Sequence, residues 1–357
     1  MPTDFLIIGA GAIGLTSAQA LLQAGHRVTL VEQGAVGREA SWAGGGILSP
    51  LCPWDYREPV TRLAHRSMGM FSEAAVKLHD ATGIDTEYQR SGMLLLPPYN
   101  NALAASWCEQ HRFDLQSVAL GDHLAEHLDG QQGDGLLLSE VAQVRNPRLL
   151  QALRAHVAML GGKILEQHEV RQFEIKGDRV ISLQTKHGKL SADSYIVAAG
   201  AWSKKLLGAQ ALGMDIRPVR GQILLFKFDA PPFRNILLKQ DLYMIPRRDG
   251  HVLVGSTLEE VGFDKSTTSA ARENLLDRIR EIFPNWQNEP IQHWAGFRPG
   301  SPDNIPTIGR HPYLANLYAN TGHFRYGVTM SLASAELLLN EIEGQPQPIA
   351  VEAYRWH

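Results

Sequence analysis

The chain has 357 residues, 44% of them hydrophobic and 20% charged, with a formal net charge of −3 at pH 7. This length allows two domains or one domain with a large insertion. The nearly balanced charge excludes the strongly basic surface that binds nucleic acid or an anionic membrane, and the Arg247–Arg248 pair is read as solvated. Cys52 and Cys108 have no metal-ligating or redox spacing, which is typical of the reducing cytoplasm and predicts no metal site.

The first thirty residues predict a strand, a glycine turn, a helix and a second strand. The first strand is Phe5–Ile8, the helix is Ile13–Ala24 and the second strand is Arg27–Glu32. A helix of this length suits a crossover between parallel strands. Although residues 5–22 carry no charge, no Lys or Arg precedes them, so neither a signal peptide nor a membrane span is expected.

Three glycines in this turn predict a phosphate-binding site. Gly9 allows a tight turn, Gly11 lets backbone N–H groups approach a pyrophosphate, and Gly14 lets the helix pack closely on the strand. Glu32 closes the second strand 18 residues after Gly14, near the interval at which an acid meets a ribose hydroxyl. We therefore predict dinucleotide binding. The carboxylate of Glu32 would disfavour a phosphate on the ribose 2′ position.

A glycine-rich segment follows at residues 37–50, where Ser41 and Trp42 precede Gly44, Gly45 and Gly46. Such a segment is too rich in glycine to be a packing element, so a ligand is expected close to its backbone. The alternative is a flexible surface loop.

Apolar periodicity and turn residues predict the other elements. The expected helices span residues 63–78, 146–160, 269–283 and 327–343, and the expected strands lie at 92–97, near 170, near 180, and at 194–200, 222–228, 242–246 and 251–255. The segment 194–200 is apolar on both faces, as in a central parallel strand.

Parallel α/β signals come in three separated pieces, and antiparallel signals lie in the two gaps between them. We therefore predict an α/β protein with a discontinuous Rossmann-like nucleotide-binding domain, formed by residues 1–84, 142–216 and 296–357. Residues 85–141 and 217–295 are expected to form a substrate domain, with a mainly antiparallel sheet flanked by helices. A ligand pocket is expected at the junction.

Five motifs along the chain resemble the D-amino-acid oxidase superfamily of FAD enzymes, and within it the glycine oxidases of the thiamine pathway. The motifs are Gly9-x-Gly11-x-x-Gly14 with Glu32, and the segments 41–48, 196–203, 294–300 and 322–327. The last two are the specific ones, because the glycine turn alone does not separate FAD from NAD.

The resemblance implies a noncovalent FAD. Sarcosine oxidases attach flavin through a cysteine just after the arginine motif, and residues 300–304 of this chain contain none. The implied cofactor-binding residues are Gly9, Gly11, Ala12, Ile13, Gly14, Glu32, Gln33, Ser41, Trp42, Gly44, Gly45, Gly46, Ile47, Val170, Ala199, Gly200, Trp202, Arg325, Tyr326, Gly327, Val328 and Thr329. The start of the last helix would stabilise negative charge on the reduced flavin.

The resemblance also implies a substrate site. Arg298 would hold the substrate carboxylate bidentately, and Tyr243 would donate its hydroxyl to the same group. Leu258, at the place of a family methionine, and Arg325 would line the pocket. His323 is expected to be a packing residue, because an amine with a free lone pair loses hydride directly.

The implied reaction is oxidative deamination of glycine, with sarcosine and small D-amino acids as further candidate substrates. Hydride passes to flavin N5, O2 reoxidises the flavin to give H2O2, and the imine yields glyoxylate and ammonia or feeds thiazole synthesis. Three alternatives stay open: a D-amino-acid or sarcosine oxidase or dehydrogenase, a redox-sensing module without chemistry, and a nicotinamide dehydrogenase. The resemblance implies a homotetramer, and the two cysteines predict a cytoplasmic location.

Overall fold

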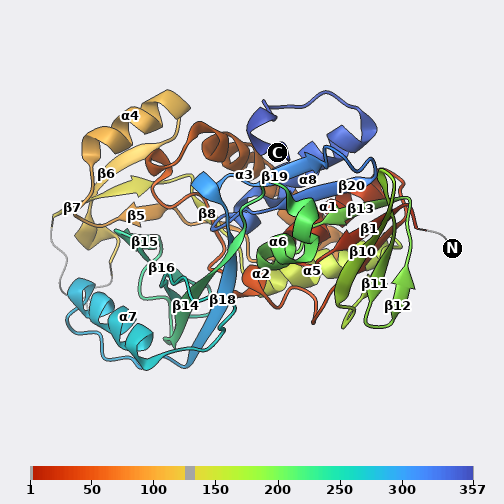
Figure 1. Cartoon of the computed structure of the whole chain (residues 1–357). Helices are drawn as coiled ribbons and strands as arrows, with labels where there is room; N and C mark the ends of the chain where they lie inside the picture. Colours follow the sequence, from red (N-terminus) through yellow and green to blue (C-terminus); the bar gives the residue numbers. More distant parts are fainter. Residues whose placement is uncertain (1–2, 125–132, 357) are drawn as a thin grey trace.

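The computed structural model describes residues 3–124 and 133–356, which form two large sheets with helices around them (Figure 1). This mixed architecture confirms the predicted α/β fold. In the part of the chain that is described, we find no helix that is long and apolar enough to cross a membrane.

The first sheet has six strands in the order β19-β20-β13-β1-β2-β9. Their bounds are β1 Phe5–Ile8, β2 Val28–Val31, β9 Lys163–Leu165, β13 Ser194–Val197, β19 Thr307–Arg310 and β20 Leu317–Thr321. All pairs are parallel except β19 with β20. Every residue of β1 and β2 is buried, as expected for parallel strands covered on both faces.

Different elements pack against the two faces of this sheet. Phe5 and Ile7 of β1 pack in a core with helices α1 Ala12–Gln23, α3 Glu58–Thr82, α5 Asn146–Met159 and α8 Gly327–Glu343. Leu6 and Ile8 point to the other face, because side chains alternate along a strand. There they meet a three-stranded antiparallel sheet, β10 Val170–Lys176, β11 Arg179–Thr185 and β12 Gly188–Leu190, which the sequence did not reveal as a separate layer.

The second sheet has eight strands in the order β18-β14-β17-β16-β15-β5-β7-β6. Their bounds are β5 Met93–Leu95, β6 Leu115–Ala119, β7 Asp134–Leu138, β14 Arg217–Lys227, β15 Ile236–Lys239, β16 Leu242–Pro246, β17 His251–Gly255 and β18 Gln292–Gly300. All pairs are antiparallel except β15 with β5. Helices α7 Ser269–Ile282 and α4 Asn101–His111 contribute to separate hydrophobic cores with this sheet.

The junction between the two sheets is formed by segments far apart in sequence. A small sheet joins β3 Ile47–Leu48, β8 Ala142–Gln143 and β4 Gln89–Arg90. The glycine-rich segment contains a short helix, α2 Ala40–Ala43, which the sequence did not predict and which contacts β18 and α5. The strands of each large sheet come from separated pieces of the chain, while the domain boundaries themselves remain a prediction.

Candidate active site

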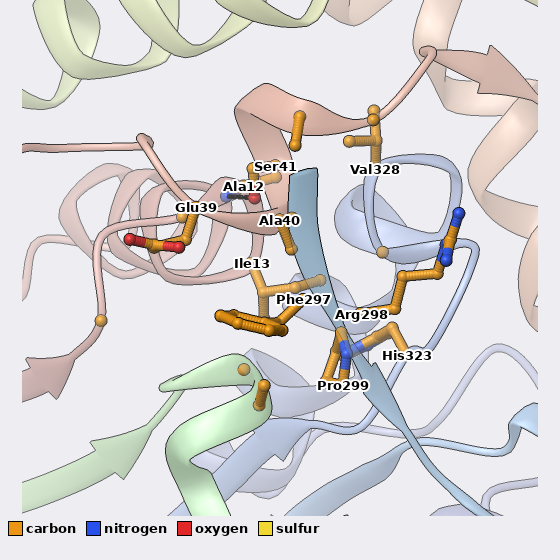
Figure 2. A pocket seen from close by; sticks show the side chains of 18 of the residues that line it. Ala12, Ile13, Glu39, Ala40, Ser41, Phe297, Arg298, Pro299, His323 and Val328 are labelled. Atoms are coloured by element: carbon orange, nitrogen blue, oxygen red, sulfur yellow. Dashed lines mark hydrogen bonds between the residues drawn. The ribbon is translucent and has the colours of Figure 1, made fainter. Parts of the chain in front are cut away.

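A cavity of about 430 Å³ lies where residues of the two sheets meet. Its wall runs from the carboxyl ends of β1 and β2, past the glycine-rich segment, to β18 and the start of α8. Figure 2 shows Glu39 and Ser41 of the glycine-rich segment and Arg298 of β18 around this cavity. The location matches the expected crevice beside the carboxyl ends of parallel strands.

The turn after β1 requires glycine, because neighbouring backbone atoms lie too close to leave room for a Cβ atom. Gly9 has φ +104°, and a Cβ atom there would lie 2.4 Å from the Ala198 carbonyl oxygen. A Cβ atom on Gly14 would lie 1.9 Å from the Gly9 carbonyl oxygen. Gly9 and Gly11 line the cavity, whereas Gly14 packs the helix onto the turn and is not part of the wall.

Glu32 is buried at the end of β2 and also lines the cavity. Its Oε2 atom accepts a hydrogen bond from the Ala10 N–H at 2.8 Å, and its Oε1 atom accepts one from the Gly34 N–H at 3.0 Å. Burial raises the pKa of this carboxyl, and the backbone donors oppose that shift. The carboxylate is therefore fixed in position beside the space where a ribose hydroxyl would donate to it.

The glycine-rich segment is held by side chains and is not a loose surface loop. Ser41 Oγ accepts a hydrogen bond from the Ala12 N–H at 2.9 Å, at the first turn of α1. The buried Asn146 amide donates to the Ser41 carbonyl oxygen at 2.7 Å and to the Gly44 carbonyl oxygen at 2.9 Å. Its own Oδ1 atom is buried without a hydrogen-bond partner.

Arg247 also holds the glycine-rich segment in place. The structure thereby corrects the interpretation of Arg247 as a solvated residue. It is only 4% exposed, and its guanidinium donates to the Gly45 carbonyl oxygen at 2.6 Å and to the Val144 carbonyl oxygen at 2.9 Å. Burial lowers its pKa to about 10, so the group is still a cation at neutral pH. The sequence did not predict that Asn146 and Arg247 hold the glycine-rich segment. Asn146 was interpreted only as the start of a helix, and Arg247 only as part of a basic pair.

Arg298 lies on β18 at the other end of the cavity. Its guanidinium donates to the Ser256 hydroxyl at 2.5 Å and to the Thr257 carbonyl oxygen at 3.2 Å. Gly221 on β14 makes room for it, since a Cβ atom there would lie 2.2 Å from Arg298 Nη1. Burial lowers the pKa of Arg298, and no carboxylate of residues 3–124 or 133–356 forms an ion pair with it. The site thus presents a cation that lacks an anion.

Tyr243 of β16 lies beside this arginine and is 8% exposed. A Cβ atom on Gly255 would lie 3.0 Å from the Tyr243 hydroxyl, and one on Gly45 would lie 3.3 Å from its ring. Two glycines therefore admit the ring between β17 and the glycine-rich segment. Tyr243 is close enough to Arg298 to raise its pKa against the larger effect of burial.

The start of α8 closes the cavity wall with Gly327, Val328 and Thr329. Thr329 Oγ1 donates to the Ile47 carbonyl oxygen at 2.9 Å and so ties the helix to the glycine-rich segment. The N-cap residue Tyr326 makes no side-chain capping bond. The first N–H groups of α8 therefore face the cavity region without a side-chain cap, and the helix dipole favours negative charge there.

His323 lines the cavity and is 1% exposed. Its Nε2 atom shares a 2.9 Å hydrogen bond with Ser334 Oγ, and burial lowers its pKa to about 3. The imidazole is therefore neutral in the physiological range, which fits the packing role expected for it.

Besides Gly14, two further predicted residues do not lie on the cavity wall. Trp42 packs against the Trp294 ring, with the centroids 5.5 Å apart. Leu258 is 51% exposed, which corrects its assignment to the pocket. The flanking Thr257 and Glu259 form hydrogen bonds with Gln222 and Arg220 of β14, while the Leu258 side chain between them is exposed. Ser256 takes the wall position instead.

The other predicted residues line the same cavity. They are Gly9, Gly11, Ala12, Ile13, Glu32, Gln33, Ser41, Gly44, Gly45, Gly46, Ile47, Val170, Ala199, Gly200, Trp202, Tyr243, Arg298, Arg325, Tyr326, Gly327, Val328 and Thr329.

Comparison with known proteins gives one family match that covers most of the chain. Residues 4–340 match the DAO family, described as FAD dependent oxidoreductase. The chain is 43% identical over 353 residues to a glycine oxidase of Pseudomonas aeruginosa, covering 98% of this chain and 97% of that protein.

Two further comparisons span nearly the whole chain. The chain is 31% identical to the bifunctional protein ThiO/ThiG of Trichormus variabilis, over 97% of this chain and 53% of that protein. The crystal structure of a glycine oxidase from Bacillus cereus superposes with a TM-score of 0.88 at 27% identity, covering 97% of this chain and 96% of that one.

Proposed function

The chain belongs to the DAO family of FAD-dependent oxidoreductases, and we propose that it oxidises small amino acids at the carbon beside the amine, with glycine as the first candidate. It is an FAD-dependent amino-acid oxidase. The observation that carries the proposed substrate is Arg298, a half-buried cation without a carboxylate partner among the described residues. It lines the same cavity as the glycine turn and Glu32.

The residues present fit FAD. Backbone approach at Gly9 and Gly11, where a Cβ atom would be crowded, leaves a cradle for a pyrophosphate, and Glu32 is fixed beside it. Asn146 and Asn320 also line the cavity, and each has a buried Oδ1 atom without a hydrogen-bond partner, as expected where a polar ligand binds. When bound, FAD supplies the two-electron acceptor. No cysteine occurs in residues 300–304 to attach it covalently.

The chain's own residues bind and orient the substrate in this proposal. Arg298 holds the carboxylate through charge-assisted bonds, and Tyr243 donates its hydroxyl to the same group. Two contacts on one carboxylate fix the direction of the Cα–H bond. The uncapped start of α8 stabilises negative charge at its end of the cavity. His323 is a neutral imidazole hydrogen-bonded to Ser334, and the proposal assigns it no proton transfer.

The proposed reaction balances as glycine, O2 and water giving glyoxylate, ammonia and H2O2. Sarcosine would give methylamine in place of ammonia, and a small D-amino acid would give its α-keto acid. We also propose that the imine supplies thiazole synthesis, on the strength of the motifs shared with thiamine-pathway oxidases. A cytoplasmic location and a homotetramer remain proposals from the same resemblance.

A peroxide-coupled substrate screen tests the proposed function. We expect the purified yellow protein to release H2O2 with glycine, and with sarcosine or D-alanine according to their fit. Catalase is the control, because it removes the peroxide and abolishes the signal. A protein that carries flavin but releases no peroxide with any of these substrates would contradict the oxidase proposal.

A further inference from the structure

We propose that this site accepts amines with two carboxylates, of which iminodiacetate is the simplest, and that Arg325 binds the second carboxylate. The proposal rests on the proposed function, since Arg298 must bind the first one. It adds a substrate class in which the second anionic group increases affinity.

Arg325 is the second cation at the substrate end. It lies just before α8, lines the cavity with Arg298, and is half-buried. Its guanidinium is 5.8 Å from the centre of the Phe324 ring, and the Tyr56 hydroxyl is its hydrogen-bonding neighbour. Among the residues that the structure describes, no carboxylate pairs with it, in contrast to Arg66 of α3, which pairs with Glu336 of α8.

The two arginines are close enough to affect each other. Arg325 lowers the pKa of Arg298, after the larger effect of burial, because two like charges repel. Tyr243 raises the pKa of both, so it lies within electrostatic range of each guanidinium. Arg298, Arg325 and Tyr243 also line the same cavity, so both cations border one binding space.

The acids on the cavity wall do not neutralise this pair. Glu32 accepts backbone N–H bonds at the nucleotide end. Glu39 pairs with Lys265 at 2.7 Å, and Asp241 pairs with Arg278 at 2.5 Å. Glu169 is 57% exposed in its side chain and lies 4.0 Å from Arg171. Each wall carboxylate thus has other partners, and the positive charge at the substrate end is left uncompensated.

Charge balance then favours a dianion. The reacting amine must be neutral, so bound glycine carries one negative charge and leaves one of the two arginines unpaired. A second carboxylate on the amine removes that imbalance in a partly buried space, where an ion pair is worth more than in water.

The reaction with this substrate balances without another reactant. Two electrons and a proton leave one CH2 group as hydride, the N–H proton leaves the amine, and a C=N bond forms. Water then cleaves the imine. Iminodiacetate, O2 and water therefore give glyoxylate, glycine and H2O2, and the glycine formed is itself a candidate substrate.

Comparison of iminodiacetate with sarcosine tests the proposal, because the two differ by one carboxylate on the N-substituent. We expect kcat/KM for iminodiacetate to exceed that for sarcosine by about tenfold or more, because a hydrogen bond to a charged group is stronger than one between neutral groups. Initial rates are measured, so that oxidation of the glycine formed from iminodiacetate does not add to the H2O2 signal.

Variants locate the effect. In Arg325→Gln the iminodiacetate-to-sarcosine ratio should fall to about one, whereas Arg325→Lys should keep part of the preference because it keeps the charge. Arg310→Gln is the matched control: this arginine also lies over an aromatic ring, Tyr318 at 5.5 Å, but is exposed and outside the cavity wall. Its ratio should equal that of the unmodified protein.

The outcomes separate the two proposals. A protein that oxidises glycine but shows no preference for iminodiacetate, or keeps the preference in Arg325→Gln, overturns the second-carboxylate site alone. A protein that oxidises none of these amines overturns the proposed function and this inference with it. If Arg325→Gln fails to retain FAD, the Arg325→Lys variant decides. A preference for iminodiacetate that it keeps in part or in full supports the charge role, and a ratio of about one overturns it.

Discussion

The two ends of the cavity differ in the groups that line them. The nucleotide end consists mainly of backbone, where Gly9, Gly11 and the glycine-rich segment bring N–H and carbonyl groups close to the ligand space. The substrate end consists of side chains, chiefly Arg298, Tyr243 and Arg325, which come from three separate segments. In the proposed function, the first end binds the cofactor and the second end selects the amine that is oxidised.

This difference predicts separable failures. Damage at the backbone end should remove FAD and with it all activity, while damage at the side-chain end should leave FAD bound and reduce substrate use. The variants below test that separation, beginning with the largest expected effect.

Gly11→Val should abolish FAD binding. A Cβ atom at Gly11 would lie 2.9 Å from Ser41 Oγ, so the added methyl groups crowd the turn and disturb the Ala12–Ser41 bond. Flavin absorbance per protein measures the loss. Gly69→Ala is the control, because nothing lies within 4 Å of a Cβ atom there, and it should retain full flavin. Normal flavin content in Gly11→Val would refute the role of this turn.

Arg298→Met should keep FAD and lose substrate. We expect kcat/KM for glycine to fall by about 100-fold or more, because truncating one side of a buried charged pair costs about 2–5 kcal/mol. Steady-state peroxide assays at several glycine concentrations measure it. Arg62→Met, which removes an exposed arginine paired with Glu58, is the matched control. Equal kinetics in both variants would place the carboxylate site elsewhere.

His323 lies between the two ends and should act through stability. Its folded pKa of about 3 is below the ordinary 6.5, so the unfolded chain binds a proton that the folded chain excludes. This contribution is complete above pH 6.5 and is lost as the pH falls from 6.5 toward 3. At pH 5 the loss is on the order of 2 kcal/mol.

Urea unfolding at pH 8 and pH 5 measures the effect of His323. In His323→Gln the decrease in unfolding free energy between these pH values should be smaller by about that amount. The same pH dependence in both proteins would mean that His323 is protonated in the folded state.

Tyr243→Phe should have the smallest effect. It removes one hydroxyl from the proposed carboxylate site and leaves the ring that packs between Gly45 and Gly255. We expect KM for glycine to rise by about tenfold, since one bond to a charged group is worth about 1.5 kcal/mol. Flavin content should not change. A loss of flavin with unchanged KM would assign Tyr243 to the nucleotide end.

Sequence was sufficient for the features that depend on local spacing. The strand, glycine turn and helix of residues 5–23 follow from apolar period and glycine positions, because neighbours along the chain determine them. The α/β fold class followed from the alternation of such signals. Arg298 and Tyr243 were found through motifs that resemble a known family, not from periodicity.

Features that depend on contacts between residues far apart in the sequence were not predicted. Arg247 and Gly45 are 202 residues apart in the chain, and Asn146 and Ser41 are 105 apart, so no local pattern marks their hydrogen bonds. Leu258 was placed in the pocket by position in a motif, whereas bonds from Thr257 and Glu259 to β14 turn it outward. The separate sheet β10-β11-β12 was also missed, because strand pairing is non-local.

Anaerobic titration of the purified protein with glycine tests the central claim most directly, because it observes both ends of the cavity at once. The account predicts visible flavin bands that bleach on addition of glycine and return with air as H2O2 appears. Arg298→Met should show the same bands but bleach only at much higher glycine concentrations. Flavin bands that no glycine concentration bleaches, or that bleach equally in both proteins, would contradict it.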